Sequence, residues 1–341
     1  MEFSLLNPET KPSLPSRPIS NQIEPNPYYI EKSSDLHTKV TEANVQILPF
    51  IHQPTPEGVM ELCEHYSTKY NIDLQYLDMR DKTDSGAIFS KFFLYLQKNP
   101  AIFDLDQGGS KGVILGHGAN HVIPLLIYNK DNKLHMVVFD SNAGCKIKGY
   151  FNIAAMFPTA TFYLNAGTRQ ADDGSCMADA LCILKEALQL NELHQLITSR
   201  LIKDHEDFKK SSTSIFTISK PDNFGLFKMP ERLLFTAQIS KYLEHADLNT
   251  LMRNGRSLKE YRDYFVIHVS MSKNGKNISS NISSYLYCKG IEHKNILDKR
   301  WKKQLQILEI EGPGSDDDIS KFDSCGFMPV DVPLSPCTPR N

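Results

Sequence analysis

Two apolar runs joined by the stretch NKDN constrain the fold of this 341-residue chain more than any other feature. HVIPLLIY and KLHMVVFDS are rich in strand-forming residues, and NKDN is typical of a tight turn. The sequence therefore predicts an antiparallel hairpin centred between Lys130 and Asp131. Pairing outward from this centre places four pairs on one face: Ile127 opposite Leu134, Leu125 opposite Met136, Ile123 opposite Val138, and His121 opposite Asp140.

This register would bring a histidine and a carboxylate together at the open end of the hairpin. Three apolar pairs suit a buried face, and a slip by one residue would send them to the other face. Directly opposed Cβ atoms lie about 4.5–5.5 Å apart, so His121 could donate a hydrogen bond to Asp140. Pro124 lacks a backbone donor, which predicts that its strand lies at a sheet edge or bonds its other neighbour there.

A cysteine stands at the predicted start of a helix farther along the chain. In SCMADALCILKEALQL the apolar residues recur at helical spacing, and Cys176 is the second residue of this run. The positive end of a helix dipole stabilises a thiolate, and a nearby imidazolium would complete an ion pair. Gln170 could donate its amide NH₂, beside the backbone N–H of Cys176, to a developing oxyanion. Asp172 and Asp173 would oppose thiolate formation, so we expect them to face solvent.

Each of these residues also has an ordinary structural interpretation. A cysteine at a helix start is more often a small buried side chain, which is how we interpret Cys145 and Cys182. His117 in the GHGANH loop is a rival base, but no opposing carboxylate is predicted for it. Asp140 could simply begin a turn with the two residues that follow it. The catalytic interpretation depends on the combination, because the predicted hairpin joins a histidine to an acid independently of the cysteine.

The order and spacing of these residues resemble the cysteine proteases of the ubiquitin-like-protease clan (CE clan) and, within it, the YopJ family of bacterial effector acetyltransferases. The shared pattern is a His at a strand start, an acid at the end of the next strand, and a Gln followed, after five residues, by a Cys at a helix start. Here these are His121, Asp140, Gln170 and Cys176. Four longer stretches are also similar to family segments, so the resemblance spans roughly residues 40–310: VMELCEHYSTKYNIDLQYL, KGVILGHGANHVIPLLIYNKDNKLHMVVFDSN, MPERLLFTAQISKYL and NGRSLKEYRDYF.

The predicted fold class is α/β (α+β), with a mixed central sheet and helices, because strand-like and helical segments both occur between the two ends of the chain. The resemblance implies a ubiquitin-like-protease-type cysteine protease core plus a helical regulatory region. We divide the chain into a flexible Pro- and Ser-rich leader at 1–40, a catalytic core at 41–195, a C-terminal helical part at 196–310 that completes the core and holds a regulatory or ligand site, and a flexible tail at 311–341.

The resemblance implies ping-pong transfer of acetyl from acetyl-coenzyme A (acetyl-CoA) through Cys176 to Ser, Thr or Lys of a host protein, such as a signalling kinase. It also implies activation by inositol hexakisphosphate in the host cytoplasm, after secretion from a bacterium without a cleaved signal peptide. Two alternatives stay open. The same triad would serve a deubiquitinase or another ubiquitin-like-protein protease, whose acid is commonly Asp, as Asp140 is here. A binding protein with a degenerate site would fit Met177, which stands where the family commonly has Gly.

Basic residues gather in the stretch YCKGIEHKNILDKRWKKQLQ, whose leucines and Trp301 would form the apolar face of a helix. The whole chain has a net charge of only −2, which predicts no nucleic-acid binding and makes this local patch the candidate for binding phosphate groups. Those groups would belong to coenzyme A or to an inositol phosphate. The predicted phosphate-binding residues are Lys289, Lys294, Lys299, Arg300 and, outside this stretch, Arg256.

Three classes of protein are not expected from this sequence. Seven cysteines without zinc-type spacing predict a reducing compartment and no metal site. No run approaches the roughly 18 apolar residues of a membrane span, so no span is predicted. The stretch MEFSLLNPETKPSLPSRP lacks the basic start and apolar run of a cleaved signal peptide.

Overall fold

The computed structural model describes residues 26–31, 52–78, 94, 98, 105–117, 121–143, 147–170, 174–205, 219–239, 243–273, 276–283 and 285–310. The chain divides into two units, Met1–Asp298 and Lys299–Asn341, and their boundary lies within the last helix. The apolar pattern of GAIFSKFFLYLQK (86–98) predicts a helix or a buried strand, and that of TSIFTIS (213–219) predicts a strand. Both segments lie mostly outside the described residues, and the tail at 311–341 lies wholly outside them.

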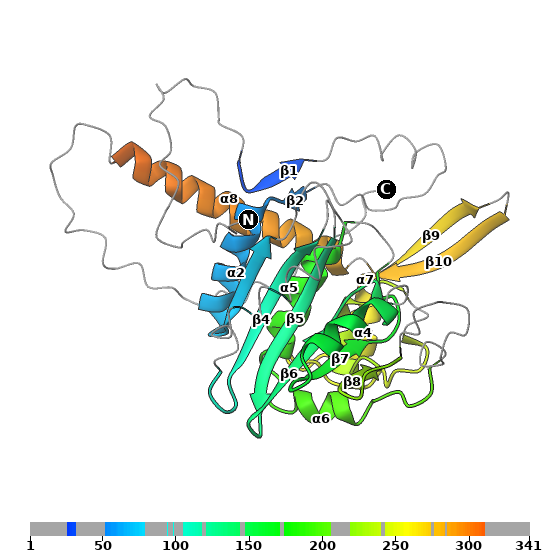
Figure 1. The fold of residues 1–341 in the computed structure, drawn as a ribbon. Helices are drawn as coiled ribbons and strands as arrows, with labels where there is room; N and C mark the ends of the chain where they lie inside the picture. The colour runs from blue at the N-terminus through cyan, green and yellow to red at the C-terminus, as the bar shows by residue number, and fades with distance from the viewer. Residues whose placement is uncertain are drawn as a thin grey trace. The chain divides into compact units, whose positions relative to one another are not determined.

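A six-stranded mixed sheet forms the centre of the larger unit (Figure 1). Its strands are β3 (Leu74–Asp78), β4 (Ser110–His117), β5 (His121–Lys130), β6 (Lys133–Val138), β7 (Thr161–Asn165) and β8 (Phe224–Phe227). Strands that follow one another in the chain are neighbours in the sheet, and the β4–β5 and β5–β6 pairs are antiparallel while the other three are parallel. The predicted fold class, a mixed central sheet with helices, is confirmed. The sequence did not predict β8.

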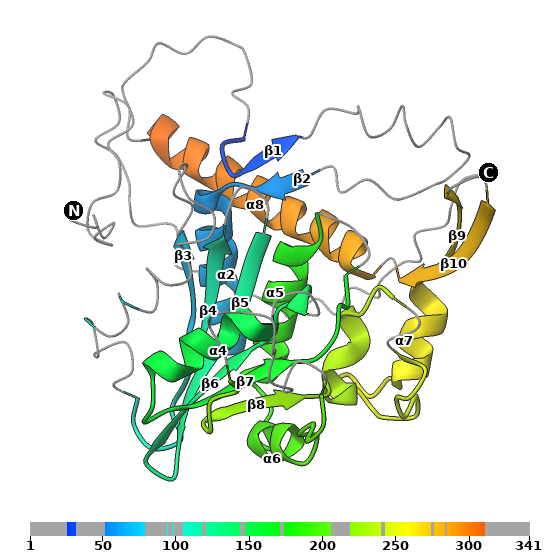
Figure 2. The same cartoon turned by 45° about the vertical axis from the view of Figure 1, so that its right-hand side comes forward.

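Helices cover both faces of this sheet (Figure 2). α4 (Ile147–Met156) packs on one face, whereas α5 (Cys176–Ala187) packs on β5 and β4 from the other face and α2 (Pro56–Tyr70) packs beside β3. The remaining elements are β1 (Tyr29–Glu31), β2 (His52–Pro54), α6 (Leu193–Thr198), the 3₁₀ helix η4 (Glu231–Thr236), α7 (Leu258–Phe265), β9 (Val266–Lys273), β10 (Lys276–Ser283) and α8 (Tyr285–Ile310). In the C-terminal part the sequence predicts helices in MPERLLFTAQISKYLEHA, RSLKEYRDYF and KNILDKRWKKQLQIL. The second and third correspond to α7 and to part of α8, which begins earlier than predicted, whereas the described residues of the first form only the short 3₁₀ helix η4.

Part of the predicted leader is structured. β1 pairs with β2 in an antiparallel ladder, and the backbone N–H of Thr55 donates to the carbonyl of Tyr28 at 2.9 Å. Thr55 also caps α2, because its hydroxyl accepts from the N–H of Gly58 at 3.1 Å. A Cβ on Gly58 would lie 1.9 Å from the Tyr28 carbonyl oxygen, so only glycine fits here. This close approach packs the described residues of the leader onto the first turn of α2.

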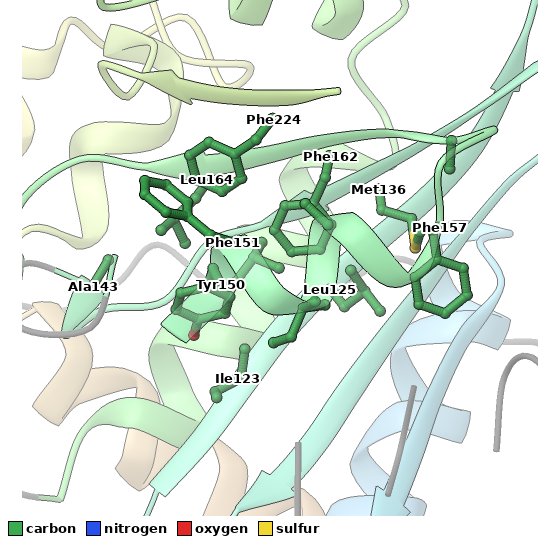
Figure 3. Packing of buried hydrophobic residues seen from close by; sticks show 14 of the residues in the cluster. Ile123, Leu125, Met136, Ala143, Tyr150, Phe151, Phe157, Phe162, Leu164 and Phe224 are labelled. Carbon is green, nitrogen blue, oxygen red and sulfur yellow. The ribbon is translucent and has the colours of Figure 1, made fainter. Parts of the chain in front are cut away.

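The main core lies between α4 and the sheet (Figure 3). Alternate residues of the strands point to this face, as the two-residue period of a strand requires. They meet one side of α4, and the fully buried members include four strand residues and one from α4: Ile123, Leu125, Phe162, Leu164 and Phe151. The opposite face meets α5, where a Cβ on Gly112 would lie 2.9 Å from a methyl carbon of Leu188. Glycine therefore lets α5 approach β4 closely.

The hairpin of β5 and β6 is present, but the predicted register is wrong by two residues. Asp131 and Asn132 alone form the turn, with φ values of 55° and 58°, and Lys130 pairs with Lys133. Positive φ at both central residues is the signature of a type I′ turn, whose twist matches the flanking strands. A shift of two residues keeps every side chain on its predicted face.

Of the two placements predicted for the strand of Pro124, the sheet edge is wrong. β5 lies inside the sheet, between β4 and β6. Pro124 stands opposite Ile114 of β4, and its carbonyl accepts a hydrogen bond from the backbone N–H of Phe139 at 2.9 Å. The missing donor is thus tolerated within a central strand.

We expect the turn to limit which residues position 132 accepts. An Asn132→Ala variant should lose about 1 kcal/mol of unfolding free energy, because alanine tolerates the left-handed region less well than asparagine. Asn132→Gly should lose nothing, since glycine adopts positive φ freely. Urea unfolding of both variants would measure the difference, and equal stability of the two would contradict this assignment of the turn.

Candidate functional site

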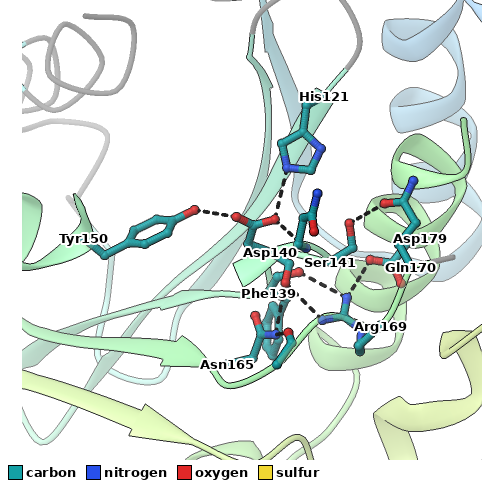
Figure 4. Close-up of polar contacts among 11 residues, drawn as sticks. His121, Phe139, Asp140, Ser141, Tyr150, Asn165, Arg169, Gln170 and Asp179 are labelled. Carbon is teal, nitrogen blue, oxygen red and sulfur yellow. Dashed lines mark hydrogen bonds and ion pairs between the residues drawn. The ribbon is translucent and has the colours of Figure 1, made fainter. Parts of the chain in front are cut away.

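The first residue of β5, the segment after β6 and the first residue of α5 meet at one end of the sheet. His121 begins β5, Asp140 lies two residues past the end of β6, and Cys176 begins α5. The imidazole Nε2 of His121 lies 3.0 Å from Oδ1 of Asp140 (Figure 4). Asn142, and not Asp140, continues the observed register opposite His121, so the contact runs diagonally past the paired part of the ladder.

Asp140 is held by more than the imidazole. It is fully buried, and its Oδ1 also accepts from the backbone N–H of Asn142 at 2.8 Å. The hydroxyl of Tyr150, from α4, donates to the other carboxylate oxygen at 2.8 Å. Burial by itself would raise the pKa of Asp140, but His121 and these two donors outweigh it and lower the pKa. Asp140 is therefore an ionised, oriented acid.

The imidazole of His121 stands between this acid and the cysteine. Burial lowers the pKa of His121, but hydrogen bonds and charge interactions with Asp140 and Cys176 outweigh it and raise the pKa to about 9. Since Nε2 faces the acid, Nδ1 is the ring nitrogen left for the hydrogen bond to Cys176. Cys176 is itself buried at the head of α5, with 5% of its surface exposed. The three predicted residues thus form one connected group.

The raised pKa of His121 predicts how stability depends on pH. Protonated His121 contributes stability that is fully present below its unfolded pKa of 6.5 and is lost as pH rises through about 9. Between pH 7 and pH 10 the wild-type chain should therefore lose more unfolding free energy than a His121→Gln variant. Urea unfolding at each pH measures this difference, in which groups common to both chains cancel. Parallel pH profiles would contradict the assignment.

Gln170, the predicted oxyanion donor, lies beside this group. The hydroxyl of Ser141 donates to its amide oxygen at 2.6 Å, and its backbone N–H approaches the Ser141 carbonyl at 3.4 Å. Figure 4 shows the amide oxygen turned toward Ser141, which fixes the orientation of the side chain. Asp172 and Asp173, expected to face solvent, lie outside the described residues, and so does Cys145. Cys182 is buried within α5, as interpreted from the sequence.

The rival base, His117, ends β4 instead of lying in a loop. It stands directly across the ladder from His121.

Two residues that support this site were not singled out in the sequence. Arg169 is 1% exposed, and its guanidinium reaches Asp179 on α5 and backbone carbonyls next to the acid. Gln238 donates from its side chain to the hydroxyl of Ser175, the residue just before Cys176, at 3.0 Å. Gln238 lies 63 residues from Ser175, and Arg169 lies 30 residues from Phe139 and 10 from Asp179, so neither has a local periodic signal.

The residues predicted to bind phosphate have a different setting. Lys289 pairs with Glu292, and Lys294 pairs with Asp298 at 2.7 Å, each within one turn of α8. Lys294 also lies over the ring of Tyr29. These acids offset part of the predicted positive charge. Lys299 and Arg300 lie farther along α8, and the exposed Arg256 precedes α7 and lies over the ring of Tyr264.

Neither a metal cluster nor a membrane-spanning helix is found among the residues that the structure describes. No three His, Cys, Asp or Glu side chains of those residues are grouped to hold a metal ion. None of their helices combines the length and the apolar character that a membrane crossing requires.

Comparisons with known proteins give structural matches alone. No protein-family model matches the sequence, and no curated protein does. Among solved structures of YopJ-family effectors, AvrA delL154 with IP6 and CoA matches at a TM-score of 0.45 and 17% identity, covering 71% of this chain and 89% of that one. HopZ1a in complex with IP6 and CoA matches at 0.47 and 7% identity, over 71% and 83% of the two chains. HopZ1a in complex with IP6 matches at 0.43 and 10% identity, over 72% and 84%.

Proposed function

We propose that this chain is a cysteine-dependent acyltransferase that takes acetyl from acetyl-CoA onto Cys176 and passes it to Ser, Thr or Lys of a host protein. The observation that supports it most is the connected group of Cys176, His121 and the buried Asp140, with 3.0 Å between imidazole and carboxylate. Such a group serves nucleophilic catalysis, because the acid orients the imidazole and stabilises its charged form.

In the first half-reaction His121 already carries the proton that the thiol gives up, as its raised pKa indicates, and the sulfur of Cys176 attacks the thioester carbonyl. The new C–S bond forms, the bond to the coenzyme A sulfur breaks, and His121 returns the proton to that leaving thiolate. The amide of Gln170 and the backbone N–H of Cys176 are the proposed donors to the oxyanion. The contact from Ser141 supports this role, because it holds the amide oxygen and so orients the NH₂ group.

In the second half-reaction a hydroxyl or amine of the host protein attacks the acetyl-cysteine. His121 accepts the proton of the incoming nucleophile, the new C–O or C–N bond forms as the C–S bond to Cys176 breaks, and His121 returns the proton to the departing sulfur. A signalling kinase is the substrate that the family resemblance favours, in the host cytoplasm after secretion from a bacterium.

Inositol hexakisphosphate is proposed as an activator through the same resemblance. The positive charge of the basic residues of α8 suits phosphate groups, but Lys289 and Lys294 already form ion pairs with carboxylates. An inositol phosphate bound there would compete with Glu292 and Asp298 for these lysines. Lys299, Arg300 and Arg256 complete the proposed set.

Intact-mass spectrometry tests the proposed function. The purified chain is incubated with acetyl-CoA, with and without inositol hexakisphosphate, beside a Cys176→Ala variant. We expect a labile acetyl adduct on the wild-type chain that Cys176→Ala lacks. An absence of adduct under both conditions would refute acetyl transfer.

The second candidate is a protease for ubiquitin or a related protein. Asp140, the acid common among the clan's proteases, favours it, and water would then replace the protein acceptor. A ubiquitin probe with a C-terminal electrophile discriminates between the two. Labelling of Cys176 by that probe, without an adduct from acetyl-CoA, would favour the protease.

A further inference from the structure

Arg169 is the largest fully buried side chain described in this structure, and it contacts both the segment that bears Asp140 and the helix that begins at Cys176. It belongs to the segment between β7 and α5 and immediately precedes Gln170. One guanidinium nitrogen donates to Asp179 at 2.6 Å and to the carbonyl of Phe139 at 3.1 Å, and another approaches the carbonyl of Asp140 at 3.4 Å. Figure 4 shows the guanidinium between these groups.

The backbone of Arg169 is fixed as well. Its N–H donates to the carbonyl of Ser141 at 2.9 Å, and its carbonyl accepts from the N–H of Gln238 at 2.9 Å. The backbone that carries this side chain is therefore held by a hydrogen bond at its N–H and another at its carbonyl. A guanidinium presents several donors in a rigid plane, so it reaches a carboxylate and two carbonyls at once. A lysine would offer a single ammonium on a flexible stem.

Each partner of Arg169 lies close to a proposed catalytic residue. Asp179 is on α5, three residues after Cys176, so the ion pair fixes the first turn of the nucleophile helix. Phe139 and Asp140 form the segment on which the acid stands. One cation thus links the backbone of the acid to the helix of the cysteine.

The charge of Arg169 lies near two buried carboxyl groups, those of Asp179 and Asp140. The pKa of Asp179 is raised above its ordinary value, because burial raises it, Arg169 offsets only part of this, and the charge of Asp140 raises it again. Two buried carboxylates therefore interact with each other, and the guanidinium lies beside both segments. Removing the cation alone would leave Asp179 as an uncompensated buried charge.

We propose that Arg169 is a positioning residue of the triad, which holds the segment bearing Asp140 and the helix bearing Cys176 in the mutual placement that His121 requires. This inference depends on the proposed function for the assignment of the triad. A purely structural ion pair predicts something different, because its loss would change stability and leave the reactivity of the folded site unaltered.

The test uses full-length variants and two readouts. An Arg169→Met/Asp179→Leu double variant removes both buried charges, a change that often leaves stability nearly neutral. Arg169→Lys keeps a cation for Asp179 but not the planar set of donors. The matched control, Arg200→Met/Glu231→Leu, removes another arginine–carboxylate pair of the same chain, joined by two hydrogen bonds.

Iodoacetamide alkylation of Cys176, followed by peptide mass spectrometry from pH 5 to pH 10, measures the reactivity of the thiol. That reactivity depends on whether the imidazole of His121 is still placed to activate it. At temperatures where every variant is folded, the double variant should alkylate at least about tenfold more slowly than wild type at pH 6–7. Arg169→Lys should show a smaller loss, and the control pair should follow the wild-type profile. If the double variant does not fold, Arg169→Lys decides by the same comparison.

Alkylation profiles of Arg169→Lys and the double variant that superimpose on wild type would overturn the inference. The adduct from acetyl-CoA is measured separately on wild type. A wild-type chain that forms no adduct but loses alkylation in the Arg169 variants would refute acetyl transfer and support the positioning role. A wild-type profile like that of an isolated thiol would overturn both proposals.

Discussion

An Asp140→Asn variant is expected to lose on the order of 10³–10⁴ in kcat/KM for acyl transfer while keeping its fold. Asparagine has nearly the shape of the acid, so the buried site can still hold it. The pKa of His121 is raised to about 9, against the effect of burial, chiefly by its contacts with Asp140. Without that carboxylate the pKa of His121 should fall, and the amide NH₂ would favour the wrong imidazole tautomer.

The measurement separates kcat from KM and follows both from pH 6 to pH 10. Loss of an orienting acid should lower kcat and leave KM for acetyl-CoA little changed, because Asp140 is fully buried. Asp263→Asn is the matched control, since Asp263 also pairs with basic side chains but lies on the exposed side of α7. A wild-type kcat in Asp140→Asn would refute the proposed role of the acid.

Stability of Asp140→Asn is expected to fall by about 1–3 kcal/mol, the cost of leaving a buried hydrogen-bonding group poorly satisfied. Two donors besides the imidazole face this side chain, from Tyr150 and Asn142. The amide keeps one acceptor oxygen and presents two donors where the carboxylate only accepts. The kinetic comparison should therefore be made below the unfolding temperature of both chains.

The three proposed catalytic residues could be read from the sequence even though the hairpin register was wrong. The pattern of apolar residues fixes which face a strand buries, and a shift of two residues leaves that face unchanged. His121 and Asp140 therefore lie on the same face, as predicted, and make contact although Asp140 is two residues from the position directly opposite His121. The turn lies one residue later than predicted, because asparagine and aspartate adopt positive φ more readily than other non-glycine residues and Asp131 and Asn132 both do so.

The ion pairs of the basic residues in α8 could be predicted in part from the sequence. Glu292 follows Lys289 by three residues and Asp298 follows Lys294 by four, spacings that place side chains together on a helix. The supporting contacts of Arg169 and Gln238 were not readable, because each joins segments that only the folded chain brings together. An arginine in a polar loop is usually exposed, so the sequence does not indicate that Arg169 is buried.

Phe162→Ala is expected to lower the free energy of unfolding by about 3–5 kcal/mol, since it removes a fully buried aromatic ring and leaves a cavity. Phe162 lies on β7, where its ring stacks on the ring of Phe224 (Figure 3). The ring centroids of Phe162 and Phe224 are 5.8 Å apart, and those of Phe162 and Tyr150 are 6.2 Å apart. Phe162→Leu should lose less than about 1.5 kcal/mol, because leucine refills most of the volume. Tyr264→Ala, at an aromatic side chain that is 42% exposed, is the surface control and should lose less than about 1 kcal/mol.

Urea unfolding measures these changes, and the same Phe162→Ala sample shows whether the core reaches the site. Tyr150 packs against Phe162 with its ring and donates to Asp140 with its hydroxyl, so a loosened ring should weaken the hold on the acid. We therefore expect slower alkylation of Cys176 at neutral pH in the folded variant. A loss of stability without slower alkylation would mean that the other contacts of Asp140 suffice to orient it. A loss of less than about 1 kcal/mol would contradict the packing itself.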